Sequence, residues 1–286
     1  MREEDALAAR PPSSALPLRS YRFLRRWPVL SIVILTALTV GAVFAPQISP
    51  QDPIYASLRD RNAPPTWFTQ WYEEHPKVTR RYILGADHLG RDLLSRIIYG
   101  SRVSLMVAVT ALLAGGIVGT ALGLFAGSTG GQADQVLMRV VDVSQAVPYI
   151  LIALVIVITL GQGIGVIIAI VAWTTWGVFA RQVRGEALQL REMDYVALAR
   201  VAGASQVRVM LRHILPGVMS TLIVVGTLRI GGLILFEAIL SYLGAGIKPP
   251  TRAWGVMGSD GRDYLGSAWW VAFFPGMAIF LTVLAL

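Results

Sequence analysis

Long runs of apolar residues alternate with short charged stretches along the 286 residues of this chain. A helix that crosses a bilayer needs about 20 mostly apolar residues, and the pattern predicts six such spans. The expected spans are 27–46, 103–127, two within 143–180 that separate at Gly161-Gln162-Gly163, 218–243 and 267–286. We therefore expect an all-α membrane protein with six transmembrane helices.

The charged stretches between these runs predict the topology. Six arginines lie in residues 1–26, and six more lie from Arg181 to Arg212. With six spans, both groups fall on one side, which the positive-inside rule places in the cytoplasm. The eight cations of 47–102 count for less, because long translocated loops weigh less in this rule. The expected parts are a cytoplasmic tail (1–26), a first transmembrane helix (27–46), an extracytoplasmic loop (47–102) and a transmembrane core (103–286).

Composition agrees with a membrane protein and excludes other classes. Hydrophobic residues make up 55% of the chain and charged residues 15%, whereas a soluble domain has about 25% charged residues. The chain has no cysteine, which excludes disulfides and thiolate metal sites. The net charge of +8 fits arginine-rich cytoplasmic segments and requires no nucleic acid.

Lysine is almost absent, which helps to decide whether the chain itself can bind ATP. Lys77 and Lys248 are the only lysines, and a phosphate-binding P-loop needs a Lys followed by Ser or Thr. Val78 and Pro249 follow them instead. The chain is therefore not expected to be an enzyme, and any ATP would be bound by a partner.

The cytoplasmic segment 184–216 carries the most informative pattern. Tyr195, Leu198, Ala199 and Ala202 recur at helical spacing on one face. Gly203 suits the end of that helix, and the next Ser suits the N-cap of a second helix. The pattern predicts a helical hairpin whose apolar ridge either fits a groove on another protein or packs on its own bundle.

The same residues carry a resemblance. The run Asp194–Ser205, followed by Arg212–Pro216, resembles the cytoplasmic EAA loop of ABC-importer permeases and looks most like the peptide subfamily. The family pattern reads Glu-Ala-Ala, three residues, Gly, nine residues, Ile, one residue, Leu-Pro. Matching positions here are Ala197, Leu198, Ala199, Gly203, His213, Leu215 and Pro216, with Tyr195 shortly before them. This chain departs from the pattern with Ala for Glu, Leu for the middle Ala and His for Ile.

Two further stretches are similar to the same subfamily. The first is an extracytoplasmic signature before the second span, with Leu84, Gly85, Asp87, Gly90, Arg91 and Asp92. The second is the C-terminal region, with 237–244, Pro249-Pro250, Trp254-Gly255 and 274–276. The resemblance covers nearly everything from Arg22 onward. Family members usually continue with a short polar tail after the last span, and this sequence ends at Leu286.

The resemblance implies the type I architecture of ABC-importer permeases and a set of partners. These are a second, homologous permease, two cytoplasmic ATPases that hold ATP and Mg, and an extracytoplasmic peptide-binding protein. The EAA loop would dock on the ATPases, and short peptides would cross the cytoplasmic membrane by alternating access. This chain would hold no cofactor or metal of its own. The subfamily also includes permeases for nickel and other small solutes, so that cargo is the alternative.

Two functions outside this family are the alternatives. A gradient-driven secondary transporter should repeat discontinuous helices in two halves, and the sequence shows no repeat. A polytopic enzyme would need acid, base or metal groups converging at one depth, and none is evident. His88 has no suitably spaced partner, so it is not expected to bind a metal.

The segment Leu84–Arg96 and the residue after it have a pattern that predicts their local structure. Leu89, Leu93, Leu94 and Ile97 form a short amphipathic face. This is typical of an interfacial helix at the bilayer edge, with Arg91, Asp92 and Arg96 on its polar side. The functional interpretation is a mouth element that faces the delivering protein.

A few charged and small residues lie inside the expected spans. Arg229 and Glu237 are eight residues apart and so share one side of a helix, and Asp142 enters span three. Internal ion pairing is one explanation, and a translocation pathway that attracts the peptide carboxylate through Arg229 is the other. Gly115, Gly119, Gly123 and Gly127 predict close helix packing, and Pro148 predicts a kink.

Overall fold

The computed structural model describes residues 29–248 and 251–286, and that part of the chain is all-α. The expected tail 1–26, residues 27–28 of the first expected span and Pro249-Pro250 lie outside the described residues. Within them no strand occurs, and two isolated β-bridges in the first loop join Pro65 to Tyr82 and Ala86 to Asp92. The all-α fold class is therefore confirmed for the described part.

Thirteen of the labelled elements carry the architecture. In chain order they are α2 (Val29–Val43), α3 (Ala45–Ile48), η2 (Leu58–Asp60), α4 (Thr69–Glu74), α5 (Leu93–Thr129), α6 (Gly131–Ala146), α7 (Tyr149–Leu160), α8 (Ile164–Leu190), α9 (Asp194–Val201), α10 (Gln206–Val209), α11 (Leu215–Tyr242), α12 (Trp254–Gly261) and α13 (Trp270–Ala285). A π-helical turn, η3 (Met210–Ile214), links α10 to α11, and η4 (Arg262–Tyr264) follows α12.

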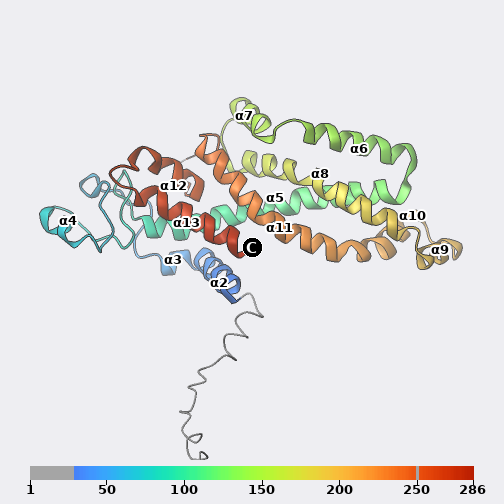
Figure 1. The fold of residues 1–286 in the computed structure, drawn as a ribbon, viewed down its shortest axis with the longest axis horizontal. Helices are drawn as coiled ribbons and strands as arrows, with labels where there is room; N and C mark the ends of the chain where they lie inside the picture. Colours follow the sequence, from blue (N-terminus) through green and yellow to red (C-terminus); the bar gives the residue numbers. More distant parts are fainter. Residues whose placement is uncertain (1–28, 249–250) are drawn as a thin grey trace, which may run out of the picture.

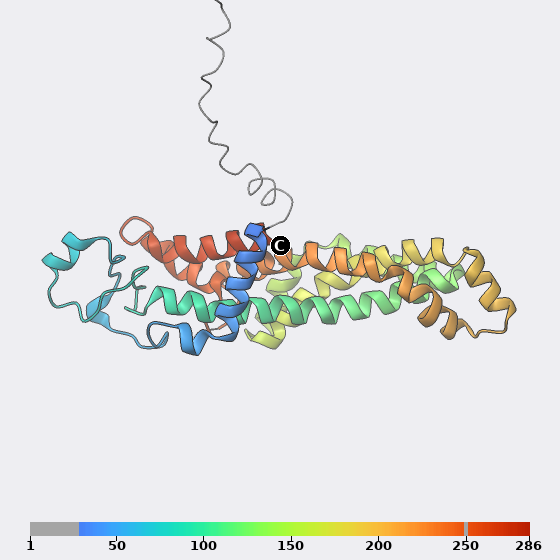
Figure 2. The same cartoon turned by 90° about the horizontal axis from the view of Figure 1, so that it is seen from below.

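The helices form one elongated bundle. Figure 1 shows α5 running along most of its length, with α8 and α11 beside it. The loop that carries α4 lies at one end together with α12, and we call this the loop end. Helices α9 and α10 lie at the other, the hairpin end, and Figure 2 shows the same arrangement from a second side.

Three helical segments are long and apolar enough to cross a membrane: α5, α8 and the continuous stretch Gln206–Tyr242. Helices α6 and α7 qualify only as a pair, which is bent by 80°. Helices α2 and α13 are apolar but have only 15 and 16 residues. The described residues thus give three or four spans, and the count of six stays a prediction.

The helix that contains the second expected span begins at Leu93, ten residues before that span. The carboxylate of Asp92 caps α5 by accepting a hydrogen bond from the backbone N–H of Ser95 at 2.8 Å, which satisfies a donor that the helix itself cannot. Leu93, Leu94 and Ile97 form the first turns of α5. The prediction of a separate interfacial helix in the segment Leu84–Arg96 is therefore wrong, and the expected loop 47–102 is helical from Leu93 onward.

Pro148 breaks the chain more sharply than a kink. The preceding Val147 is extended, with ψ 132°, because a proline disfavours helical backbone in the residue before it. Helix α6 therefore ends at Ala146 and α7 leaves at 80° to it. The break expected at Gly161-Gln162-Gly163 is confirmed, since Gly161 has φ +83° and α8 begins at Ile164.

The small residues of α5 let α8 approach closely. A Cβ on Gly115, Gly119 or Gly123 would lie 2.2–2.5 Å from a backbone carbonyl oxygen of α8, and one on Gly127 would lie 2.7 Å from the Cβ of Ala187. No side chain fits at these distances, so the backbones of α5 and α8 pack directly on each other. The packing role predicted for this stripe is confirmed.

Candidate functional site

The hairpin end has the local geometry that the sequence predicts. Helix α9 ends before Gly203, which has φ +83°, a backbone conformation that glycine adopts without strain. Ser205 then caps α10, its hydroxyl accepting from the backbone N–H of Arg208 at 3.4 Å. The π-helical turn carries His213, and α11 continues directly from it with Leu215-Pro216, within the continuous helical stretch Gln206–Tyr242.

One side of the hairpin packs on the bundle. Val196 of α9, Val209 of α10 and Ile214 of the π-helical turn are fully buried. Their apolar neighbours come from three long helices and are Leu124 of α5, Val183 and Ala187 of α8, and Val218 of α11. The hairpin is therefore attached to the bundle by a small core of its own.

The opposite side of α9 is exposed and apolar. Leu198 is 68% exposed and Val201 87% exposed, and Tyr195 and Ala202 are exposed beside them. Of the ridge expected from the sequence, only Ala199 is half-buried. Both interpretations of the hairpin thus describe part of it, since one side packs on its own bundle and the ridge stays open. Val201 was missed, although its spacing of three from Leu198 signals a shared face.

Hydrogen bonds tie the hairpin to the junction of α5 and α6. The Gln206 side-chain amide donates to the carbonyl of Ser128 at 2.9 Å, and Arg191 donates to the carbonyl of Gly127 at 3.2 Å. Arg184 of α8 binds Asp134 of α6 through two parallel bonds of 2.8 and 2.7 Å, a geometry that fixes orientation as well as charge.

The remaining motif positions have structural places. Ala197 is exposed and presents no carboxylate where the family pattern has Glu, so no salt bridge can form from this position. The hydroxyl of Tyr195 donates to the carbonyl of His213 at 3.3 Å, which links the start of α9 to the π-helical turn.

At the loop end, the carboxylate of Asp60 organises the first half of the loop. Asp60 is fully buried and accepts from the Tyr82 hydroxyl at 2.7 Å, from the Thr79 backbone N–H at 2.8 Å and from the Thr79 hydroxyl. Burial alone would raise the pKa of Asp60, but these hydrogen bonds favour the carboxylate and lower the pKa overall. Burial and the bond to Asp60 raise the pKa of Tyr82, so its hydroxyl stays a donor.

Asp87 organises the second half. It is fully buried and accepts from the backbone N–H groups of Leu89 and Arg91 at 2.8 and 3.0 Å. The Arg91 side chain lies 2.7 Å from it, and Arg96 forms a second ion pair. Burial raises the pKa of Asp87, but the charges of Arg96 and Arg91 outweigh it and hold the pKa below its usual value. Asp260 of α12 lies 3.5 Å from Arg96, which joins the loop to α12.

The glycines of the signature serve close approaches in this loop. Gly85 has φ +91°, and a Cβ there would lie 2.5 Å from the ring of Trp270. Gly90 has φ +73°, and its Cβ would lie 1.9 Å from the carbonyl oxygen of Ser57. Both positions therefore require glycine for conformation and for space.

Most residues of the signature thus lie in the interior of the loop. Asp92 and Arg96 are 2% and 3% exposed, so their expected place on a polar outer side is wrong. Leu84 is half-buried and packs against the main core. His88 stacks on Tyr264, with ring centroids 5.7 Å apart. In the described part of the chain no group of three metal-ligating side chains occurs.

The charged residues of the expected spans do not come together. Asp142 of α6 pairs with Arg181 of α8 at 2.8 Å, and both side chains are more than half exposed. Glu237 is fully buried in α11 and accepts from the Ser241 hydroxyl at 2.8 Å. Arg229 is half-buried, and no ion pair joins it to Glu237 in the described residues. Of these three charged residues, ion pairing therefore explains only the position of Asp142.

Comparison with known proteins agrees with this architecture. Residues 119–286 match the family described as binding-protein-dependent transport system inner membrane component. Residues 22–65 match the N-terminal TM domain of oligopeptide transport permease C.

Named relatives cover most of the chain. The dipeptide transport system permease protein DppC of Bacillus subtilis is 35% identical over 99% of this chain and 86% of its own length. The di/tripeptide permease DppC of Pseudomonas aeruginosa is 37% identical over 89% of this chain and 82% of its own length. The glutathione permease GsiD of Pectobacterium atrosepticum is 45% identical over 71% and 67%. The chain therefore belongs to the binding-protein-dependent inner-membrane permeases of ABC importers, and it is a multi-pass membrane protein.

Proposed function

We propose that this chain is one of two homologous permease subunits of an importer that moves short peptides across the cytoplasmic membrane by alternating access. The observation that carries the proposal is the exposed apolar ridge of α9, on a hairpin that continues directly into α11. An exposed apolar ridge on a folded hairpin suits a groove on another protein. ATP and Mg would be held by two partner ATPases, in which the ridge would sit.

The structure supports a mechanical role for the hairpin. Its inner side is fixed to α5, α8 and α11 by the buried core around Val196, and Gln206 is bonded to the end of α5. A hairpin held at several points moves with the long helices rather than independently of them. ATPase closure would therefore shift these helices, and each conformation would have different contacts with the ATP-bound partners.

The names of the relatives support peptide as the cargo. They describe permeases for dipeptides, for di- and tripeptides and for glutathione, which is itself a tripeptide. Within the chain, Arg229 is the pathway candidate, because it is half-buried in α11 and could attract a peptide carboxylate. Uptake by Arg229→Gln of peptides with free and blocked C-termini tests this role, and equal uptake of both by variant and wild type would refute it.

The topology proposed from the arginines is consistent with this function. The hairpin end would face the cytoplasm together with residues 1–26, and the loop end would face outward, where an extracytoplasmic binding protein delivers peptide. A cysteine placed in the loop at Thr69, which is exposed, should react with an impermeant maleimide from outside intact cells. A cysteine at Gln132, which is exposed at the start of α6 and outside the ridge, should react only after the cells are opened.

Retention of the ATPases tests the coupling role. Leu198→Asp should weaken retention of the ATPase subunit that this hairpin contacts during purification of the complex and abolish ATP-driven uptake, because it places a charge in the apolar contact. Leu58→Asp is the matched control, since Leu58 is 77% exposed at the opposite end and should leave the ATPases bound. Full ATPase retention and uptake by Leu198→Asp, or transport by the purified chain alone, would contradict the proposal.

A further inference from the structure

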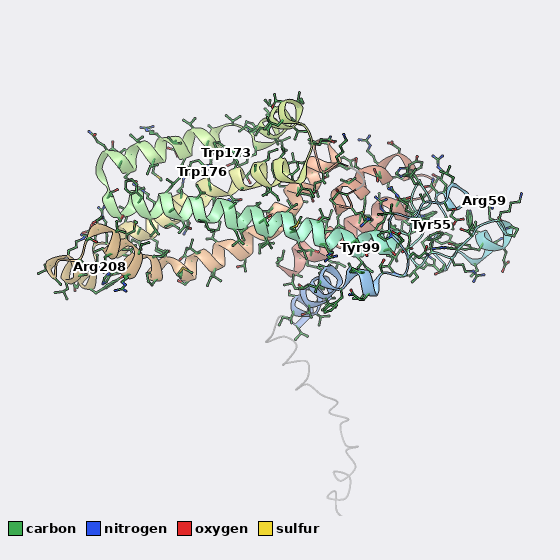
Figure 3. The ribbon with its side chains drawn as sticks, turned by 180° about the vertical axis from the view of Figure 1, so that it is seen from behind. Tyr55, Arg59, Tyr99, Trp173, Trp176 and Arg208 are labelled. Carbon is green, nitrogen blue, oxygen red and sulfur yellow. The ribbon has the colours of Figure 1, made fainter. Side chains whose placement is uncertain are left out.

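Arginines of the loop end lie over tyrosine rings. The pairs are Arg61 with Tyr264, Arg80 with Tyr55, Arg81 with Tyr72, Arg252 with Tyr99 and Arg262 with Tyr242, with 4.6–5.8 Å between guanidinium carbon and ring centroid. Figure 3 shows Tyr55, Arg59 and Tyr99 toward this end, whereas Arg208 lies at the other. Every such pair in the described residues thus belongs to the loop end.

Most of these arginines have no carboxylate partner. Across residues 29–248 and 251–286, Arg61, Arg80, Arg81 and Arg252 form no ion pair. Arg262 alone approaches a carboxylate, that of its neighbour Asp263 at 3.4 Å. The positive charges are therefore open to a partner.

The acidic residues of the loop do not balance these charges at its surface. Residues 49–92 contain six basic and six acidic residues and so have no formal net charge. Asp60, Asp87 and Asp92 are buried, however, as the internal acceptors of the loop. Five of the six basic residues are exposed, and they are Arg59, Arg61, Lys77, Arg80 and Arg81. Asp52, Glu73 and Glu74 are also exposed, so the surface of the loop carries five basic and three acidic residues and is positive overall.

Two of these guanidinium groups are also held by a hydrogen bond. Arg80 donates to the side-chain oxygen of Gln51 at 3.1 Å, and Arg61 donates to the hydroxyl of Tyr264 at 3.0 Å. An arginine whose plane rests on an aromatic ring keeps its remaining N–H groups free for a carboxylate fork. Because the side chains are already ordered, a partner loses less conformational entropy on binding them.

We propose that Arg61, Arg80 and Arg81 form the docking surface for an acidic face of the soluble peptide-binding protein. The inference rests on the proposed function, in which the binding protein must contact the permease in order to deliver its peptide. The loop that carries these residues lies at the far end of the molecule, past the first residue of α5. That position favours a soluble protein over the headgroups of the bilayer, and the family itself is dependent on a binding protein.

The test uses the assembled complex of both permeases and both ATPases in nanodiscs of neutral lipid. The probe is the peptide-binding protein of the same organism, and the readout is ATP hydrolysis as its concentration rises. The triple variant R61Q/R80Q/R81Q should need about 10- to 100-fold more binding protein for half-maximal stimulation at low salt, since each exposed charge contributes modestly. Wild type should lose this advantage as ionic strength rises, because salt screens exposed charges. The maximal rate at saturation should not change.

Two controls separate the explanations. Arg139→Gln removes one exposed positive charge from α6 and should leave the half-maximal concentration unchanged. Tyr55→Phe should behave as wild type and Tyr55→Leu should weaken docking, because only the first keeps a ring under Arg80.

Three results would overturn the inference. Equal half-maximal concentrations and equal salt dependence for wild type and the triple variant would refute the docking surface alone. A defect that appears only in nanodiscs with anionic lipid would assign the arginines to headgroups instead. A wild-type complex that no binding protein stimulates would overturn the proposed function together with the docking surface.

Discussion

The contact between α5 and α8 allows a sharp test, because one helix carries both a position that tolerates no side chain and one that does. A Cβ on Gly119 would lie 2.2 Å from the backbone oxygen of Trp176. A Cβ on Gly116, one turn away, would lie 3.5 Å from the ring of Phe179, an ordinary van der Waals contact. Gly119→Ala and Gly116→Ala therefore form a matched pair.

The expected difference follows from the geometry. A carbonyl oxygen of the backbone cannot rotate away, so α5 and α8 would have to separate by roughly 1 Å at Gly119 to restore normal contact. Such overpacking costs about 1–3 kcal/mol. The helix gains at most about 1 kcal/mol when Ala replaces Gly, a gain that both variants share. We expect Gly119→Ala to be less stable than Gly116→Ala by about 1–3 kcal/mol.

Thermal unfolding in detergent, followed by intrinsic tryptophan fluorescence, measures this difference. For a chain of this size, about 2 kcal/mol corresponds to a Tm lower by roughly 3–4 °C. Gly123→Ala, with its Cβ 2.5 Å from the oxygen of Ala180, should fall between the two. A Gly119→Ala variant that unfolds at or above the Tm of Gly116→Ala would refute the view that backbone contact sets the spacing of these helices.

Two predictions concern the loop end. Gly90→Ala should destabilise the protein by about 2–4 kcal/mol, because φ is +73° and its Cβ would overlap the carbonyl of Ser57. Gly131→Ala, at φ +64° with no atom within 4 Å, should lose only about 1 kcal/mol in the same unfolding assay, and equal losses would contradict the clash. Asp87→Asn should lower the Tm at pH 7 by removing one partner of a buried charge network, a change of about 3–5 kcal/mol. Since the pKa of Asp87 is lowered in the folded state, its contribution is fully present above about pH 4 and is lost as the pH falls through the folded pKa. The Tm difference from wild type should therefore shrink as the pH is lowered below about 4, and a difference that grows on acidification would refute this assignment.

The features that the sequence predicted correctly depend on local pattern. The break after α7 follows from Gly161 and Gly163, the turn of the hairpin from Gly203, and the contact with α8 from the small residues of α5. In each case neighbouring residues determine the backbone conformation, or a fixed period places them on one face. All the residues that determine these features lie close together in the sequence.

The features that were missed depend on residues far apart. Arg96 and Asp92 look like surface residues in the sequence, but Arg96 is neutralised by Asp87 and Asp260, which lie outside its own helix. Their burial lets α5 begin at Leu93. The sequence also did not determine which side of the hairpin packs on the bundle, because Val196 is buried only by apolar residues of other helices. Partners distant in sequence cannot be identified from spacing alone.

Helix α5 connects the two ends of the molecule. Its 37 residues make a rod of about 55 Å, whereas the hydrocarbon core of a bilayer is about 30 Å thick. The helix therefore projects well beyond the apolar layer, and both of its ends are held. Asp92 caps its start beside the network of Asp87, and its last turn accepts bonds from Arg191 and Gln206. Because α8 packs on its backbone, the rod cannot bend locally without breaking that contact. A displacement of the hairpin would thus reach the loop end as a movement of the whole helix, which gives the proposed coupling between ATPases and binding protein a physical route.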